Sequence, residues 1–312
     1  FDIFKEIRKD IFMERQQIPD YWGTNGKDKW MNLATKMYGN LGKVENKGLD
    51  FSIDYVKRFN NDFDMSFKGT FTYAHNKVLE YDEPDFQKYP NISRVGHSVD
   101  QQLLYIAERL FIDDSEVQRN PKQNLGGWVS GGDIKYKNLP DVNGNYDNVI
   151  DSNDRQYTGM PTTPEIVYGF GPSFRYKKFD FSFFFQGAAR VSMNGIHPFG
   201  AEGTRNVLQF IADDYWSETN QNIYAEYPRL SKRDNENNTK ASTYWQRNGA
   251  FLKLKNLEVG FNHKFFRVYL RGSNLLTFSP FKYWDPEMGS GSGLSYPTQR
   301  VFNVGVQFSI NK

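Results

Sequence analysis

Alternation of apolar and polar residues with a period of two constrains this chain more than any other feature. Residues 179–187 read FDFSFFFQG, so Phe179, Phe181, Phe183 and Phe185 share one face, while Ser182 lies on the other. Successive side chains of a β-strand point to opposite faces, and the pattern therefore predicts a strand with one apolar face. The same alternation recurs at 49–55, 63–73, 168–176, 266–271 and 302–310.

Weaker alternation predicts further strands at about 1–12, 98–110, 130–138 and 249–262, which makes about ten strands in total. In the last of these segments, the apolar residues shift from even-numbered to odd-numbered positions between Leu254 and Leu257. Such a shift predicts a β-bulge.

The connections between the predicted strands alternate in length. Short turns fall at 58–62, 176–178 and 263–265, and long polar segments at 13–40, 77–97, 139–163, 194–242 and 278–298. Short turns at one end and long loops at the other are typical of outer-membrane barrels. Segment 111–129 does not fit this scheme, because strand counting puts it on the short-turn side and it is too long for a turn.

The aromatic content distinguishes between two kinds of antiparallel sheet. Aromatic residues make up 17% of the chain although its mean hydropathy is −0.71, and no run of 18 apolar residues could form a spanning helix. The predicted strands carry Phe and Tyr on one face and acids, amides and Arg on the other. This favours an all-β fold, an antiparallel transmembrane β-barrel with a wet lumen. A secreted, soluble, carbohydrate-binding β-sandwich is the alternative.

Charge and residue types exclude several functions. The net charge of +2 offers no basic patch for nucleic acid, and the absence of cysteine excludes a disulfide scaffold and a thiolate metal site. No acid–base pair or nucleophile elbow is recognisable, so we expect no enzyme activity. The four histidines, at 75, 97, 197 and 263, lie too far apart in sequence to indicate a zinc site.

A loop rich in acids and amides is a candidate calcium site. Its candidate ligands are Asp141, Asn143, Asp147, Asp151 and Asp154. Calcium prefers several oxygen ligands from a tight turn. However, Tyr146 stands where an EF-hand loop has glycine, and this favours a solvated extracellular turn over a calcium site.

Tyrosine–tryptophan pairs in the predicted long loops are candidate substrate contacts. Trp216 and Trp284, with Tyr283 beside the second, lie in such loops, where their rings could stack on sugars. Most Tyr–Trp pairs of the chain are more simply explained as anchors at a membrane interface.

Several phrases of the sequence resemble one protein family. They are NLGKVENKGLDFSIDY at 40–55, DVNGNYDNVIDSNDRQYTGMPTTPEIVYGF at 141–170, KKFDFSFFFQGAAR at 177–190, DDYWSETNQNIYAEYPRL at 213–230, YWQRNGAFLKLKNLEVGF at 244–261, VYLRGSNLLTFSPFKYWDPE at 268–287 and YPTQRVFNVGVQFS at 296–309. In order and spacing they resemble the C-terminal part of a SusC-like TonB-dependent transporter of the Bacteroidetes outer membrane.

The resemblance implies a barrel of about 22 strands around a plugged lumen. Residues 1–312 would then be the C-terminal portion of the barrel, with the plug domain and the earlier strands absent from this chain. It further implies location in the cell outer membrane, contact with membrane lipid, a SusD-like surface lipoprotein on the loops at 194–242 and 278–298, and energy from TonB through the plug. The implied function is import of oligomeric nutrients, with glycans first and peptides second. One departure is that Phe308 is followed by four more residues, whereas such barrels commonly end on an aromatic residue.

Overall fold

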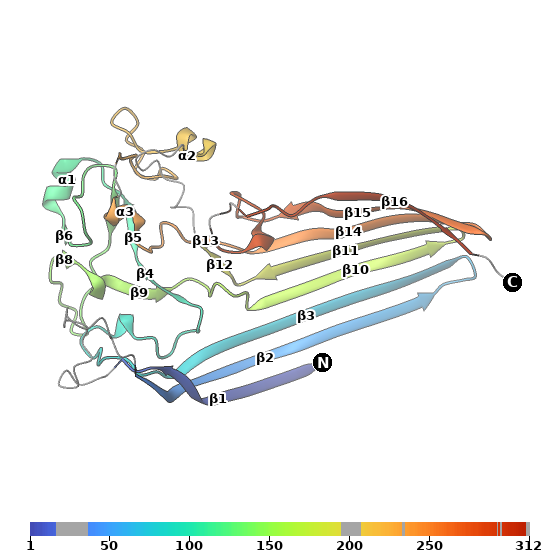
Figure 1. Cartoon of the computed structure of the whole chain (residues 1–312), viewed down its shortest axis with the longest axis horizontal. Helices are drawn as coiled ribbons and strands as arrows, with labels where there is room; N and C mark the ends of the chain where they lie inside the picture. Colours follow the sequence, from blue (N-terminus) through green and yellow to red (C-terminus); the bar gives the residue numbers. More distant parts are fainter. Residues whose placement is uncertain (17–36, 195–206, 233–234, 292, 294, 310–312) are drawn as a thin grey trace.

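Eight strands form one antiparallel sheet in which each strand pairs with the next along the chain (Figure 1). The computed structural model describes residues 1–16, 37–194, 207–232, 235–291, 293 and 295–309. The strands of the sheet are β1 (Asp2–Glu14), β2 (Tyr38–Arg58), β3 (Phe63–Glu80), β10 (Ile166–Tyr176), β11 (Phe179–Ala189), β14 (Phe251–Asn262), β15 (Phe266–Phe278) and β16 (Val301–Phe308). Because these strands form a single sheet, the two packed sheets of the sandwich alternative are not present among them.

The two ends of the sheet differ in their connections. Short turns at 59–62, 177–178 and 263–265 join strand pairs at one end, at the right of Figure 1. The described residues of connections 15–37, 81–165, 190–250 and 279–300 lie at the opposite end. The predicted alternation of short turns and long loops is therefore confirmed. The predicted bulge is confirmed too, since the register between β14 and β15 shifts between Leu254 and Asn256.

The expectation that 98–110 and 130–138 are strands of this sheet is wrong. These segments hold only the short strands β4 (Gln102–Tyr105), β5 (Ala107–Leu110) and β7 (Ile134–Tyr136), which pair outside the main sheet. The sheet accordingly has eight strands rather than ten. Segment 111–129 belongs to a single long connection at the long-loop end, so the misfit in strand counting disappears.

Two long connections fold together into what we call the loop lobe, the described residues of 81–165 and 190–250. Its other elements are η2 (Pro90–Ile92), α1 (Asp114–Arg119), β6 (Lys122–Gln123), β8 (Val149–Ile150), η3 (Ser152–Asp154), β9 (Arg155–Thr158), β12 (Ser192–Met193), α2 (Gln209–Asp213), α3 (Glu236–Thr239) and β13 (Arg247–Asn248). The one remaining helix among the described elements, η5 (Pro286–Met288), lies in the last connection. No described helix is long and apolar enough to cross a bilayer.

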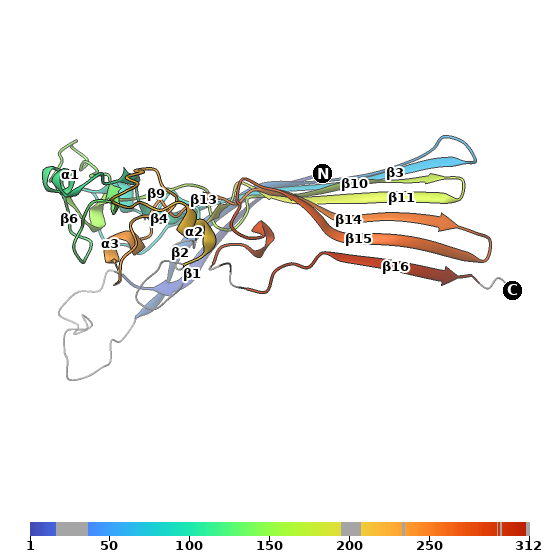
Figure 2. The same ribbon diagram turned by 90° about the horizontal axis from the view of Figure 1, so that it is seen from above.

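The loop lobe has a hydrophobic core of its own. Its buried residues come from both connections: Tyr105, Leu110, Leu125, Ile134, Tyr136, Ile150, Ile211, Trp216, Ala225, Tyr227 and Trp245. Backbone hydrogen bonds join the connections as well, from Tyr105 N to Ala241 O at 3.1 Å and from Leu110 N to Ile223 O at 2.9 Å. The lobe is thus a folded unit at one end of a curved sheet (Figure 2).

The faces of the sheet differ as the alternation predicts. Cross-strand partners such as Phe181 and Val259 are both apolar, whereas their neighbours Ser182 and Glu258 are both polar. The polar face carries ion pairs, in which Arg267 Nη2 lies 2.5 Å from Asp180 and 2.6 Å from Glu258.

Phe184 is an aromatic exception on the polar face. Its ring lies over Gly169 of β10, where an added Cβ would come within 2.8 Å of the ring. Glycine at this position therefore makes room for the ring.

Candidate functional site

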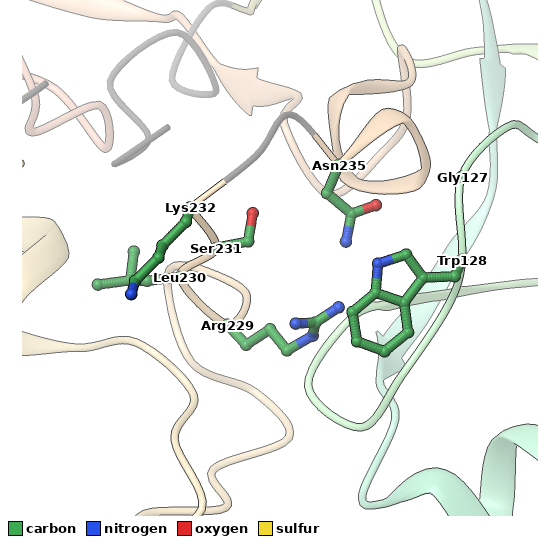
Figure 3. Close-up of a pocket in the computed structure, with 7 residues that line it drawn as sticks. All are labelled: Gly127, Trp128, Arg229, Leu230, Ser231, Lys232 and Asn235. Atoms are coloured by element: carbon green, nitrogen blue, oxygen red, sulfur yellow. The ribbon is translucent and has the colours of Figure 1, made fainter. Parts of the chain in front are cut away.

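The loop lobe contains a cavity of about 540 Å³ (Figure 3). Both connections contribute to its lining, which consists of Gly127, Trp128, Arg229, Leu230, Ser231, Lys232 and Asn235. The Trp128 side chain is 70% exposed, and the Arg229 guanidinium lies 4.8 Å from the centre of its indole ring. The volume falls within the roughly 300–1,000 Å³ common for ligand sites.

A buried carboxylate fixes the polar groups of this cavity. Asp133 is fully buried, and its Oδ1 accepts hydrogen bonds from Asn235 Nδ2 at 2.9 Å and Asn238 Nδ2 at 3.0 Å. Arg229 Nη2 donates to Oδ2 at 3.0 Å, and so does the Ser130 backbone N–H at 2.8 Å. One carboxylate therefore joins both connections and orients Arg229 beside Trp128.

Glycines shape the approach to Trp128. Gly126 and Gly127 have φ values of +97° and +69°, in the left-handed region that favours glycine. A Cβ at Gly126 would also run into Glu236. The backbone can therefore turn sharply here and present the indole outward. The exposed Trp128 ring can stack on a flat ligand that enters the cavity. The Arg229 guanidinium and the Asn235 amide can donate hydrogen bonds to oxygen atoms of that ligand.

The predicted contact residue Trp216 lies in the core of the lobe. It is only 6% exposed, and its indole packs against Gly132, where an added Cβ would run into the ring. A ligand at the surface does not reach this ring. Trp128 was not among the contacts predicted from the sequence. The one sequence feature that sets it apart is the pair of glycines before it.

Tyr283 and Trp284 pack at the edge of the same core. The Tyr283 hydroxyl hydrogen-bonds to Glu226, whose Oε2 also lies 2.9 Å from Arg247 Nη2. Burial alone would raise the pKa of Glu226, but the hydrogen bonds from Tyr283 and Arg247 outweigh it and hold that pKa below its usual value. The Trp284 indole N–H donates to Gly289 O at 3.1 Å. Both rings are half-buried, and substrate contact by them stays a prediction.

The carboxylates of the candidate calcium loop bind the backbone of their own turns. The backbone N–H of Asn145, together with that of Asn143, donates to Asp141 Oδ1 and lowers the pKa of this carboxyl. Asp147 accepts from Val149 N at 3.0 Å.

Asp151 and Asp154 form a capping box around η3, and burial raises the pKa of Asp154. In the described part of the chain, no three His, Asp or Glu side chains are grouped to hold a metal. The residues form capped turns, and calcium binding stays a prediction.

A buried lysine anchors the last long connection. Lys253 of β14 is 1% exposed, and its Nζ lies 2.5 Å from Asp285 and 2.8 Å from Glu287. Lys255 Nζ lies 2.6 Å from Glu287. Asp285 and Glu287 thus hold η5 against the sheet. The sequence alone did not reveal this role.

Comparison with known proteins gives consistent results. TonB-dependent receptor P3 of Formosa agariphila is 27% identical over 98% of this chain, and TonB-dependent receptor SusC of Bacteroides thetaiotaomicron is 25% identical over 88% of it. These matches cover 32% and 27% of the two receptors, so the chain spans about a third of the length of its curated relatives. No family model matches the chain.

Solved structures show the same fold. The RagAB peptide transporter superposes with a TM-score of 0.66 at 21% identity, covering 98% of this chain and 32% of the other. In its "open-open" state, the RagAB peptide importer gives 0.69 at 18% identity, covering 99% of this chain and 32% of the other. The sheet therefore matches part of a TonB-dependent transporter barrel, and the chain is similar along nearly its whole length to a section of the SusC-like TonB-dependent receptors.

Proposed function

We propose that this chain forms barrel wall and external loops of a TonB-dependent importer in the cell outer membrane. The observation that supports this best is the two-sided sheet, with rows of apolar side chains on one face and ion pairs such as Arg267–Asp180 on the other. Lipid accepts the first face and a wet lumen accepts the second. Short turns at one end and the loop lobe at the other match the periplasmic and extracellular sides of such a barrel.

The proposed cargo is an oligomeric nutrient, with glycans first and peptides second. The exposed Trp128 ring beside amide and guanidinium donors suits a sugar ring. The peptide candidate is supported by the RagAB structures, which are peptide transporters. The loop-lobe cavity is our first choice for substrate contact, and Tyr283 and Trp284 are further proposed contacts.

Uptake by cells tests this function. Cells that carry the intact gene should accumulate a labelled oligosaccharide, cells that lack it should not, and a protonophore should abolish the accumulation because TonB supplies the energy. Labelled oligopeptides form the second arm. Energy-independent accumulation, or none of either cargo, would contradict the proposal.

A variant tests the substrate contact. Trp128→Ala should weaken cargo binding by about fivefold, because a stacked ring contributes on the order of 1 kcal/mol. Tyr146→Ala is the matched control, since it removes another exposed ring of the lobe, one that does not line this cavity.

The proposed partners are a SusD-like surface lipoprotein on the loops, the remaining plug and barrel portion, and TonB acting through the plug. The lipoprotein is expected on connections 190–250 and 279–300. Deleting whole loops would remove core residues of the lobe, and surface substitutions are therefore the better test. Tyr224 and Tyr296 are exposed aromatic residues, one in each connection.

We expect Tyr224→Asp with Tyr296→Asp to reduce co-purification of the lipoprotein, and Tyr146→Asp to leave it unchanged. Equal retention in both variants would contradict this docking site.

A further inference from the structure

Near the long-loop end, apolar residues form one last continuous row across four strands of the sheet. Pairing places Ile3 opposite Leu49, Leu49 opposite Tyr73, and Tyr73 opposite Ile166, so these four residues form one row across β1, β2, β3 and β10. Rows on the short-turn side of it continue with apolar residues such as Phe51 and Phe71. In the proposed barrel, this row marks the edge of the hydrocarbon layer.

The next outward-facing row is cationic. Lys5 pairs opposite Lys47, and Lys47 opposite His75, each two residues beyond the last apolar row and therefore on the same face. Arg190 follows β11, and its guanidinium lies 6.0 Å from the centre of the Tyr73 ring. We call Lys5, Lys47 and Arg190 the cationic row.

Two carboxylates pair with basic side chains of this region. Glu45 is 13% exposed and sits 2.9 Å from Lys5 and 2.5 Å from Lys47. Glu165 is 3% exposed, 2.5 Å from His75 and 2.6 Å from Arg190.

The cations themselves face outward. The three side chains of the cationic row are 43–55% exposed, and Lys77, one row further out, is exposed as well. Together with Lys77, the four cations outnumber the two carboxylates, so this part of the surface is net positive. The two carboxylates also hold the cations in place, so little side-chain freedom remains to be lost on binding an anion.

We infer that the cationic row binds phosphate groups of lipid headgroups in the leaflet on the long-loop side. This rests on the proposed barrel function, because it needs the apolar rows to lie in hydrocarbon. The row directly adjoins those rows, so an anion that binds there sits at headgroup level. Basic residues at this level attract anionic lipids, and phosphate accepts hydrogen bonds from several ammonium and guanidinium groups at once.

The test uses the assembly that this chain forms in the outer membrane, purified in mild detergent and exchanged into phosphatidylcholine nanodiscs. Native mass spectrometry counts the lipid A molecules that stay bound, and titration with lipid A gives the affinity. The variant is Lys47→Gln with Lys77→Gln, which leaves Glu45 paired with Lys5. The matched control is Lys57→Gln with Arg58→Gln, which removes two cations from the short-turn end of the same strand.

We expect lipid A affinity to fall about tenfold or more in the variant, since each basic residue strengthens such binding roughly fivefold. The control should bind like the unaltered protein, and inorganic phosphate at equal concentration should not displace the lipid. Unchanged affinity in the variant, an equal loss in the control, or full displacement by inorganic phosphate would overturn the inference. Outer-membrane fractionation and cargo uptake, measured on the same cells, report separately on the proposed function.

Discussion

At the scale of single residues, the buried Asp133 carboxylate holds the two halves of the loop lobe together. It is fully buried and ion-paired with Arg229 across about a hundred residues of sequence. Removing one partner of a buried pair leaves a charge without compensation, which costs about 3–5 kcal/mol. Arg229→Ala should therefore lower the free energy of unfolding of the lobe by that amount, measured as the urea dependence of proteolysis within it.

Lys240→Ala is the control for this prediction. Lys240 Nζ lies 3.9 Å from Glu236 in a pair at the surface, and such pairs contribute less than about 1 kcal/mol. If Arg229→Ala resembled this control, the buried pair would not be what joins the two connections.

Glu116 makes the region around α1 sensitive to acid. Burial alone would raise the pKa of this carboxyl, but hydrogen bonds from Arg109, from the Ile112 backbone N–H and from Lys135 lower it from 4.5 to about 2. A lowered pKa in the folded state means that the stabilisation is complete above pH 4.5 and is lost as the pH falls toward 2. Amide-exchange protection of residues 107–119 should drop across this range. Glu116→Gln should show lower protection at neutral pH and a smaller dependence on pH, and an unchanged pH profile in that variant would refute the assignment.

At the scale of elements, β11 shows which face of the sheet meets lipid. Phe183 lies opposite Leu257 and beside Phe181 and Phe185, with ring centres 5.7 and 5.8 Å away. Ser182 lies opposite Glu258 on the polar face. A spin label at 183 should be quenched by a membrane-dissolved reagent, and one at 182 by a water-soluble reagent.

Introducing an arginine should have different effects at positions 183 and 182. Phe183→Arg should impair membrane assembly, because arginine near the bilayer midplane costs about 2–4 kcal/mol, whereas Ser182→Arg should assemble. Reversed label accessibilities would invert the faces, and protection of both labels from the lipid reagent would contradict a membrane-spanning sheet.

The sequence predicts the elements of the sheet better than those of the lobe, for a physical reason. Long strands with one polar face must alternate over many residues, and β2, β3, β10, β11, β14, β15 and β16 all do so. Alternation over a few residues is ambiguous, because Tyr105, Leu110 and Ile134 are buried in the local core of the lobe rather than on a face of the main sheet. The exposure of an aromatic side chain depends on distant neighbours, and for that reason sequence reasoning favoured Trp216 over Trp128.

At the scale of the whole molecule, the described sheet leaves two strands paired on one side only. These are β1 and β16, at the two edges of the eight-stranded order. Residues of β16 such as Phe302, Val304 and Phe308 are largely exposed. An open edge with apolar side chains is a template for association with other chains, and lipid tolerates no unpaired strand edge.

We therefore expect the 312-residue chain, expressed alone, to form no stable monomer. Size-exclusion chromatography with light scattering should show aggregates or detergent-dependent oligomers, because both edges and the apolar face need partners. Co-expression with a polypeptide that supplies the remaining barrel strands should give a single heat-modifiable species, since closure of the barrel pairs both edges at once. A monodisperse monomer without detergent, melting cooperatively, would show that the sheet is complete without partner strands and would contradict its role as barrel wall.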